Sequence, residues 1–168
     1  GGCASAEKKP LVSETKIVPI KEDAETLQRI DALAQFATGI HHELNDESKK
    51  ANERFLKAAL ADLGNEGLVL DVARRLVRDG DNERAIDLLT KAAKQPSPPG
   101  TIYAWLGLAY LQMGRTNEAM EANQEAIKLS PDNLAAYQNL AGLHLQAAKT
   151  NEAIAVLKSA AARTNASA

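Results

Sequence analysis

Residues 100–133 read GTIYAWLGLAYLQMGRTNEAMEANQEAIKLSPDN, and the pattern of this stretch returns in the next 34 residues, 134–167. Residues 117–119 are Asn-Glu-Ala, for example, and so are residues 151–153, which stand 34 positions later. A fixed period of this length is typical of repeat proteins, in which each unit is one small supersecondary motif. This stretch therefore predicts that the chain is built from copies of one unit.

Outward from this stretch, the same period divides the chain without gaps into the blocks 32–65, 66–99, 100–133 and 134–167. At the eighth, twentieth and twenty-seventh positions of the block, every copy has Gly or Ala. These residues are Gly39, Ala73, Gly107 and Ala141, then Ala51, Ala85, Ala119 and Ala153, then Ala58, Ala92, Ala126 and Ala160. Small residues at fixed positions allow two helices of a hairpin to approach closely.

Composition agrees with a helical fold and excludes several classes of protein. The 168 residues are 45% hydrophobic and only 4% aromatic, with a single cysteine and a net charge of −2. One cysteine cannot form an internal disulfide framework. The near-neutral charge provides no field to hold nucleic acid, so we expect no nucleic-acid partner.

The third block resembles the tetratricopeptide repeat, a 34-residue helical hairpin. The residues that carry the resemblance are Tyr103, Leu106, Gly107, Tyr110, Ala119, Ala126 and Pro131. It implies an all-α fold, a right-handed superhelical solenoid of about four 34-residue repeats. Residues 22–168 would form this domain, with 22–31 extending the first helix, and residues 1–21 would be an extended, flexible N-terminal tether. The chain departs from the family pattern at Leu63, Ser97 and Asn123.

Apolar residues recur every three or four positions before and inside the first block, which is typical of one face of an amphipathic helix. They are Leu27, Ile30, Leu33, Ala37, Ile40 and Leu44. The chain contains no glycine-rich phosphate loop, no HExxH motif and no paired cysteines. We therefore expect no enzymatic activity, no cofactor and no metal site.

The only dense group of metal-ligating residue types is His41, His42 and Glu43, followed by Asp46. We interpret His42 as a half-buried packing residue. His144 has the same interpretation, because both histidines share the repeat position of Tyr110.

The resemblance implies a binding surface along the concave side, lined by the first helix of each repeat. The candidate groove residues are Leu70, Arg74, Val77, Arg78, Ala104, Leu108, Leu111, Gln112, Gln138, Leu145 and Gln146. We expect a peptide or helix with apolar anchors and some acidity, because Arg74 and Arg78 stand one turn apart on a helix. Alternatively, Arg75 and Arg78 pair with acids of the chain such as Asp71, or are solvated.

In the first block, Phe36 and Ile40 have groove positions, and we expect the preceding segment to cover them. The Lys and Asn pattern with which related adaptors hold chaperone C-termini is absent.

Gly2-Cys3-Ala4-Ser5 resembles the start of a mature bacterial lipoprotein, in which the cysteine carries acyl chains. This resemblance implies lipidation at Cys3 and a periplasm-facing place in the bacterial cell envelope, with the cytoplasm as the alternative. Membrane contact would occur only through this anchor.

The preferred function is a non-catalytic protein–protein interaction scaffold that assists complex assembly. The alternative is a structural segment of a longer protein, or a homodimerisation module that uses the uncapped C-terminal repeat.

Overall fold

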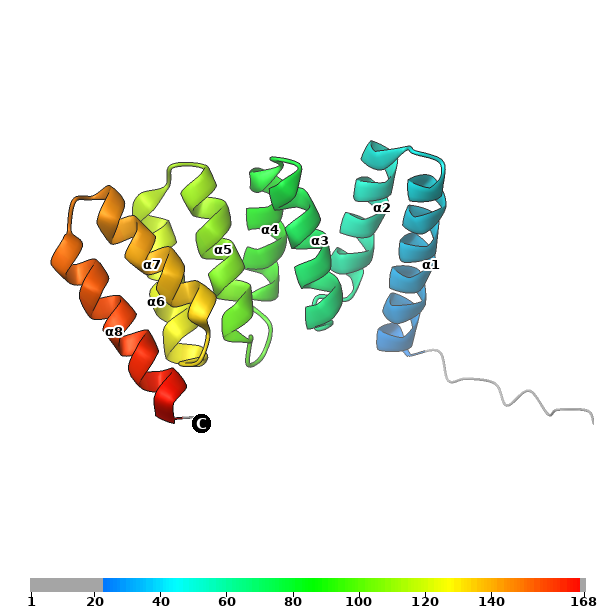
Figure 1. Cartoon of the computed structure of the whole chain (residues 1–168). Coiled ribbons are helices and arrows are strands. Elements are labelled where there is room, and N and C mark those ends of the chain that lie inside the picture. The colour runs from blue at the N-terminus through cyan, green and yellow to red at the C-terminus, as the bar shows by residue number, and fades with distance from the viewer. Residues whose placement is uncertain (1–22, 167–168) are drawn as a thin grey trace, which may run out of the picture.

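The computed structural model describes residues 23–166, which fold into helices without strands. The first two hairpins are α1 (Ala24–Leu44) with α2 (Ser48–Ala61) and α3 (Glu66–Arg78) with α4 (Asn82–Ala92). The last two are α5 (Gly100–Gln112) with α6 (Thr116–Leu129) and α7 (Leu134–Gln146) with α8 (Thr150–Ala166). The four hairpins stand in a row (Figure 1), and they confirm the predicted solenoid.

Three of the four hairpins begin with a side-chain cap, and all four turn in the same way. Side chains of Asp23, Asn65 and Asn133 cap α1, α3 and α7 by accepting a hydrogen bond from the backbone N–H three residues on. The turn between the two helices of each hairpin contains one residue with a positive φ, always at the fifteenth position of the block. These residues are Asp46, Gly80, Gly114 and Ala148. The repeat in the sequence is therefore also a repeat in backbone conformation.

The small residues that define the period are all buried. Each alanine of the three small positions is at most 7% exposed, and Gly39 and Gly107 are buried as well. A Cβ atom on Gly39 would lie 2.6 Å from the Phe55 ring, and one on Gly107 would overlap the Asn123 side chain. The close helix contacts that the sequence predicts are thus present.

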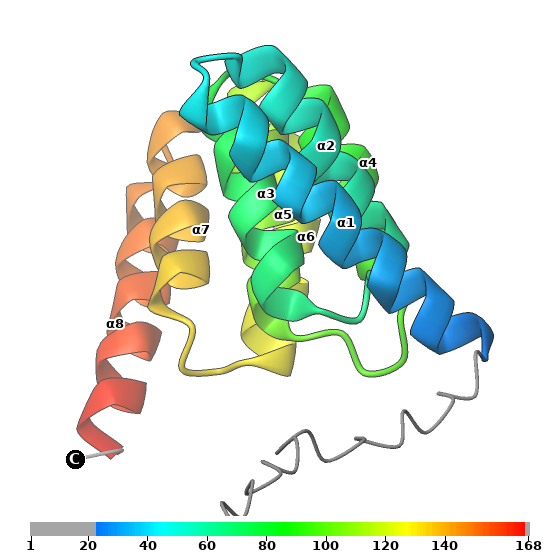
Figure 2. The ribbon, with the colours of Figure 1, turned by 90° about the vertical axis from the view of Figure 1, so that its right-hand side faces the viewer.

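The hairpins are not equally spaced. Helix α3 contacts α5, and α5 contacts α7, but no Cα atoms of α1 and α3 come within 8 Å of each other. Helix α1 instead packs on α2, which in turn contacts α3 and α4. The view turned by 90° shows α7 and α8 displaced to one side of the earlier helices (Figure 2). The first helices of the repeats therefore share one face of the solenoid, with a gap between α1 and α3.

Candidate functional site

The predicted groove residues lie on α3, α5 and α7, and most of them reach the surface. Arg74, Arg78, Gln112, Gln138, Leu145 and Gln146 are exposed, whereas Leu70, Leu108 and Leu111 are half-buried. Val77 and Ala104 are corrections to the prediction, because they are only 6% and 5% exposed. Val77 belongs to the main core, and Ala104 packs with alanines of α6 and α7. Neither side chain is open to a ligand.

The arginines of α3 have partners within the chain. Arg74 Nη1 lies 3.9 Å from Asp71, and its guanidinium lies 5.7 Å from the Trp105 ring centre. Arg78 Nε donates a 3.2 Å hydrogen bond to Asp79. A carboxylate ligand would have to compete with these acids.

Arg75 is held more firmly than its neighbours. Its Nη1 donates a 2.5 Å hydrogen bond to Glu43 of α1, its Nε bonds Asp71, and its guanidinium lies over the Phe55 ring. The bond to Glu43 is the main reason why the pKa of Arg75 is raised. The predicted alternative is confirmed for Arg75 and Arg78, which pair with acids of the chain.

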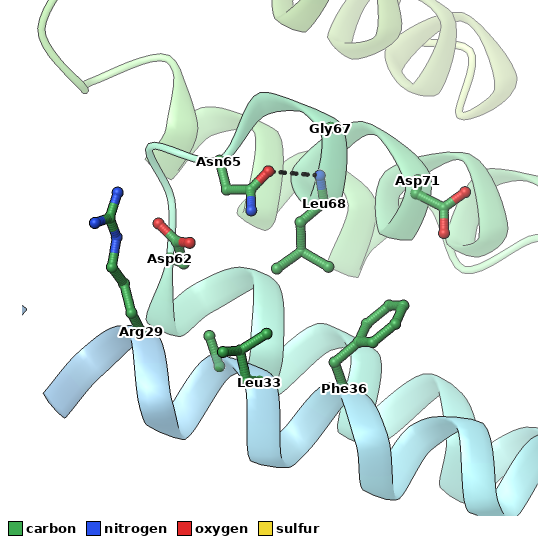
Figure 3. Close-up of a pocket in the computed structure, with 9 residues that line it drawn as sticks. Arg29, Leu33, Phe36, Asp62, Asn65, Gly67, Leu68 and Asp71 are labelled. Atoms are coloured by element: carbon green, nitrogen blue, oxygen red, sulfur yellow. Dashed lines mark hydrogen bonds between the residues drawn. The ribbon is translucent and has the colours of Figure 1, made fainter. Parts of the chain in front are cut away.

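A pocket of about 500 Å³ lies between α1 and α3 (Figure 3). Leu33 and Phe36 on α1 point toward Leu68 on α3 and form its apolar part, while Asp71 stands at one end. Arg29, Asp62 and Asn65 lie around the other end. The remaining lining residues, Ala32 and Gly67, are small. The pocket therefore exists because α1 and α3 are apart and because small residues leave the space open.

A second pocket of about 280 Å³ continues the first toward the start of α1. The two share Arg29, Asp62 and Asn65. The residues that the second pocket adds are Glu25, Gln28, Ala61 and Gly64. We call the two pockets together the α1–α3 groove. Its lining contains the acids Glu25, Asp62 and Asp71 against one base, Arg29, around an apolar centre. Glu25 lies 3.9 Å from Arg29, and Asp71 contacts Arg74 and Arg75 of α3.

Sequence reasoning found this groove only in part. Phe36 occupies a groove position of the repeat, but Leu33, Asp62 and Leu68 were missed. Gly64 and Gly67, which lie close together in the sequence, are the signal that could have indicated open space here. Their missing side chains leave open space only because α1 and α3 lie apart, and the sequence does not predict the distance between these two helices.

The histidine group forms no metal site in the described residues, where no three potential ligands come together. His42 Nδ1 instead lies 2.6 Å from Glu47 Oε2, and His42 is half-buried as predicted. Hydrogen bonds from Lys50 and then from His42 lower the pKa of Glu47. His144 is half-buried too.

Among the helices of residues 23–166, none is both long and apolar enough to cross a membrane. The candidate lipidation residue Cys3 lies outside the described residues.

Comparison with solved structures supports the fold. The crystal structure of MamA matches with a TM-score of 0.66 and 20% identity, over 85% of this chain and 85% of that one. MamA from Desulfovibrio magneticus RS-1 matches at 0.64 and 19%, over 81% and 77%. PilF of Pseudomonas aeruginosa matches at 0.63 and 22%, over 78% of this chain and 60% of that one. These identities establish a shared fold alone.

Comparison of the sequence identifies the family. No curated protein sequence matches the chain. Two models described as tetratricopeptide repeat do match it, one over residues 70–133 and the other over residues 110–168. Together they extend from the middle of α3 through α8. The hairpins α1–α2 and α3–α4 follow the same 34-residue period as the matched part. The chain belongs to the tetratricopeptide repeat family.

Proposed function

We propose that this protein is a non-catalytic scaffold that binds a peptide or helix of another protein in the α1–α3 groove. Family membership supports the general part of this proposal, because tetratricopeptide repeats are protein–protein interaction modules. The observation that carries the specific part is the pocket between Leu33, Phe36 and Leu68, which is large enough for an apolar side chain.

The groove chemistry favours a ligand with an apolar anchor and basic flanks. Leu33 is 70% exposed at the edge of the pocket, so binding there would remove apolar surface from water. The expectation of an acidic ligand rested on Arg74 and Arg78, which already have Asp71 and Asp79 beside them. Two of the groove acids have partners as well, since Glu25 lies 3.9 Å from Arg29 and Asp71 contacts Arg74 and Arg75. Asp62, together with the excess of acids over bases in the lining, favours a basic residue of the ligand.

A display experiment tests this function. Peptides selected from a random displayed library on the immobilised full chain should bind at least about tenfold more weakly to Leu33→Glu, because the new carboxylate would be desolvated against the anchor. Leu44→Glu is the matched control, since Leu44 is an exposed leucine of α1 that does not line the groove. Peptides that tolerate Leu33→Glu but are lost with Arg74→Glu/Arg78→Glu would move the site to the α3 arginines and contradict the proposal.

We also propose that acylation at Cys3 tethers the scaffold in a bacterial envelope, where it assists the assembly of a complex. Support comes from the residues Gly2-Cys3-Ala4-Ser5 alone. The residues between Cys3 and Glu22 would span roughly 25 Å as a flexible coil, enough to hold the repeats away from the lipid. In cells that make the protein, Cys3→Ser should move it from the membrane fraction to the soluble fraction. Unchanged membrane association would contradict the anchor, and Ser5→Ala is the control.

A second candidate is self-association through α8. Ile154 and Leu157 on this helix are each 46% exposed, a surface that another helix could cover. If this is the function, sedimentation should show a dimer that Leu157→Glu dissociates. A monomer at all concentrations for both proteins would contradict this candidate.

A further inference from the structure

The α1–α3 groove opens beside the point where the chain enters α1. Asp23 caps this helix, and Glu25 and Gln28 in the first turns of α1 line the nearer pocket. The residues that immediately precede Asp23 are therefore attached at the mouth of the groove. They lie outside the described residues, but their sequence is known.

This preceding sequence has the chemistry that the groove favours. Residues 16–21 read Lys-Ile-Val-Pro-Ile-Lys, which places a short apolar run between two lysines. The groove has an apolar centre at Leu33, Phe36 and Leu68, and it has more acids than bases. Pro19 limits the conformations of the free segment and so reduces the entropy lost on binding.

The lengths also agree if the segment turns back at Asp23 and runs along α1. Leu33 lies ten residues beyond Asp23, which is about 15 Å along a helix. Ile17 lies six residues before Asp23, and an extended chain of that length spans roughly 20 Å. Ile17 can therefore reach the Leu33 pocket with enough chain left for the turn. In the same arrangement Lys21 would lie nearest the end with Glu25, Asp62 and Arg29, and Lys16 nearest Asp71.

We propose that residues 16–21 occupy the α1–α3 groove of their own chain, and that a protein partner must displace them to bind. This inference rests on the proposed function, because it concerns the same groove. The attached segment is at high effective concentration and competes with any partner. The apparent affinity for a partner is then reduced by the fraction of molecules in which the groove is closed.

Disulfide trapping in the full-length chain tests the proposal. In a Cys3→Ser background, Ile17→Cys is combined with Leu33→Cys in one protein and with Ala34→Cys in the control. Leu33 and Ala34 are both exposed on α1 and almost equally far from Asp23, but only Leu33 lines the groove. Either substitution spares the core, and the distance from the attachment point does not separate the two pairs. In a glutathione redox buffer the groove pair should form an intramolecular disulfide at least about tenfold faster than the control pair.

Charge reversal then tests the lysines. Adding Lys16→Glu/Lys21→Glu to the groove pair should slow the disulfide to near the control rate. Lys8→Glu/Lys9→Glu makes the same charge change farther from α1 and should leave the rate unchanged.

Each other outcome overturns the proposal. Equal rates for the groove and control pairs would mean that the segment does not occupy the groove. A disulfide that joins two chains and accelerates with concentration would place a second copy there instead. Equal slowing by both lysine pairs would remove the specific contact. Because the trapping needs no external ligand, its failure leaves peptide binding at Leu33 to be decided by the display experiment.

Discussion

Gly107 and Asn123 meet side by side in the third hairpin. Asn123 is fully buried, donates a 2.7 Å hydrogen bond to the carbonyl of Ala119 and accepts a 3.1 Å one from Asn139 Nδ2. A polar group buried in this way is tolerated because its hydrogen bonds are made. Asn123 thus ties α6 to α7 at the position where other repeats have a large apolar residue, and Gly107 provides the room for it.

At this residue scale, we predict that Gly107→Ala destabilises the protein by about 1–3 kcal/mol, because the new Cβ overlaps the Asn123 amide. Gly142→Ala on α7 is the control, since nothing lies within 4 Å of its Cβ position. There alanine should stabilise the helix by about 0.5–1 kcal/mol. Urea unfolding measures both changes, and the same sign for both would contradict the packing argument.

At the scale of elements, the first hairpin is joined to the second by side-chain bonds, one of them the Arg75–Glu43 pair described above. Asn52 on α2 donates a 2.7 Å hydrogen bond to the carboxylate of Asp79, which ends α3. This bond is the largest cause of the lowered pKa of Asp79, and Arg78 contributes as well. Because the folded pKa is lowered, the stabilisation is present above the ordinary pKa of an aspartate and is lost as the pH falls through the folded value.

We therefore predict that Asn52→Ala raises the pKa of Asp79 toward its ordinary value. An NMR titration of the Asp79 carboxyl carbon measures this change directly. Glu118 is the internal control, because its lowered pKa depends on a backbone bond and on the bond from Arg115 at the start of α6. The difference in stability between Asn52→Ala and the unchanged protein should also shrink at low pH. An unchanged Asp79 pKa would show that the hydrogen bond is not formed in solution.

The helices themselves could be predicted from the sequence because the 34-residue period fixes which small residues are buried. The first helix shows the limit of such reasoning. Leu27, Ile30 and Leu33 share a face as their spacing indicates, yet all three are exposed. The buried residues of α1 are Ala32 and Gly39. Periodicity states which residues lie together on a helix, but it does not state which face a neighbour covers.

The candidate site was harder to predict for a related reason. Repeat positions placed Arg74 and Leu145 correctly on the surface, but they also assigned Val77 and Ala104 to the groove, where close packing of neighbouring hairpins buries them. The α1–α3 groove depends on the distance between two helices. Residue types alone cannot give that distance, and of the residues that line the groove only Phe36 was assigned to a groove position from the sequence.

At the scale of the whole molecule, the packing is uneven along the solenoid. One large cluster of buried side chains extends through the first three hairpins and includes Phe55, Leu76 and Leu89. The separate cluster that joins the third hairpin to the fourth has only Ala104, Ala126 and Ala136 as its buried members. Because repeat proteins are stabilised by contacts between neighbours, the interface of the fourth hairpin should be the weakest.

This difference predicts that α7 and α8 unfold before the other helices. Trp105 packs against the large cluster, so its fluorescence reports the first three hairpins, whereas circular dichroism reports all helices. In urea the dichroism should begin to fall at a lower concentration than the fluorescence changes, and amides of α7 and α8 should exchange faster than those of α3 and α4.

Tyr137→Ala should shift only the early change, since Tyr137 is buried in α7 and its hydroxyl donates a hydrogen bond to the Pro131 carbonyl. Leu88→Ala in α4 should shift the Trp105 change, at a cost of about 2–5 kcal/mol. If both probes coincide in all three proteins, the solenoid unfolds as one unit, and the small alanine interface is as strong as the large core.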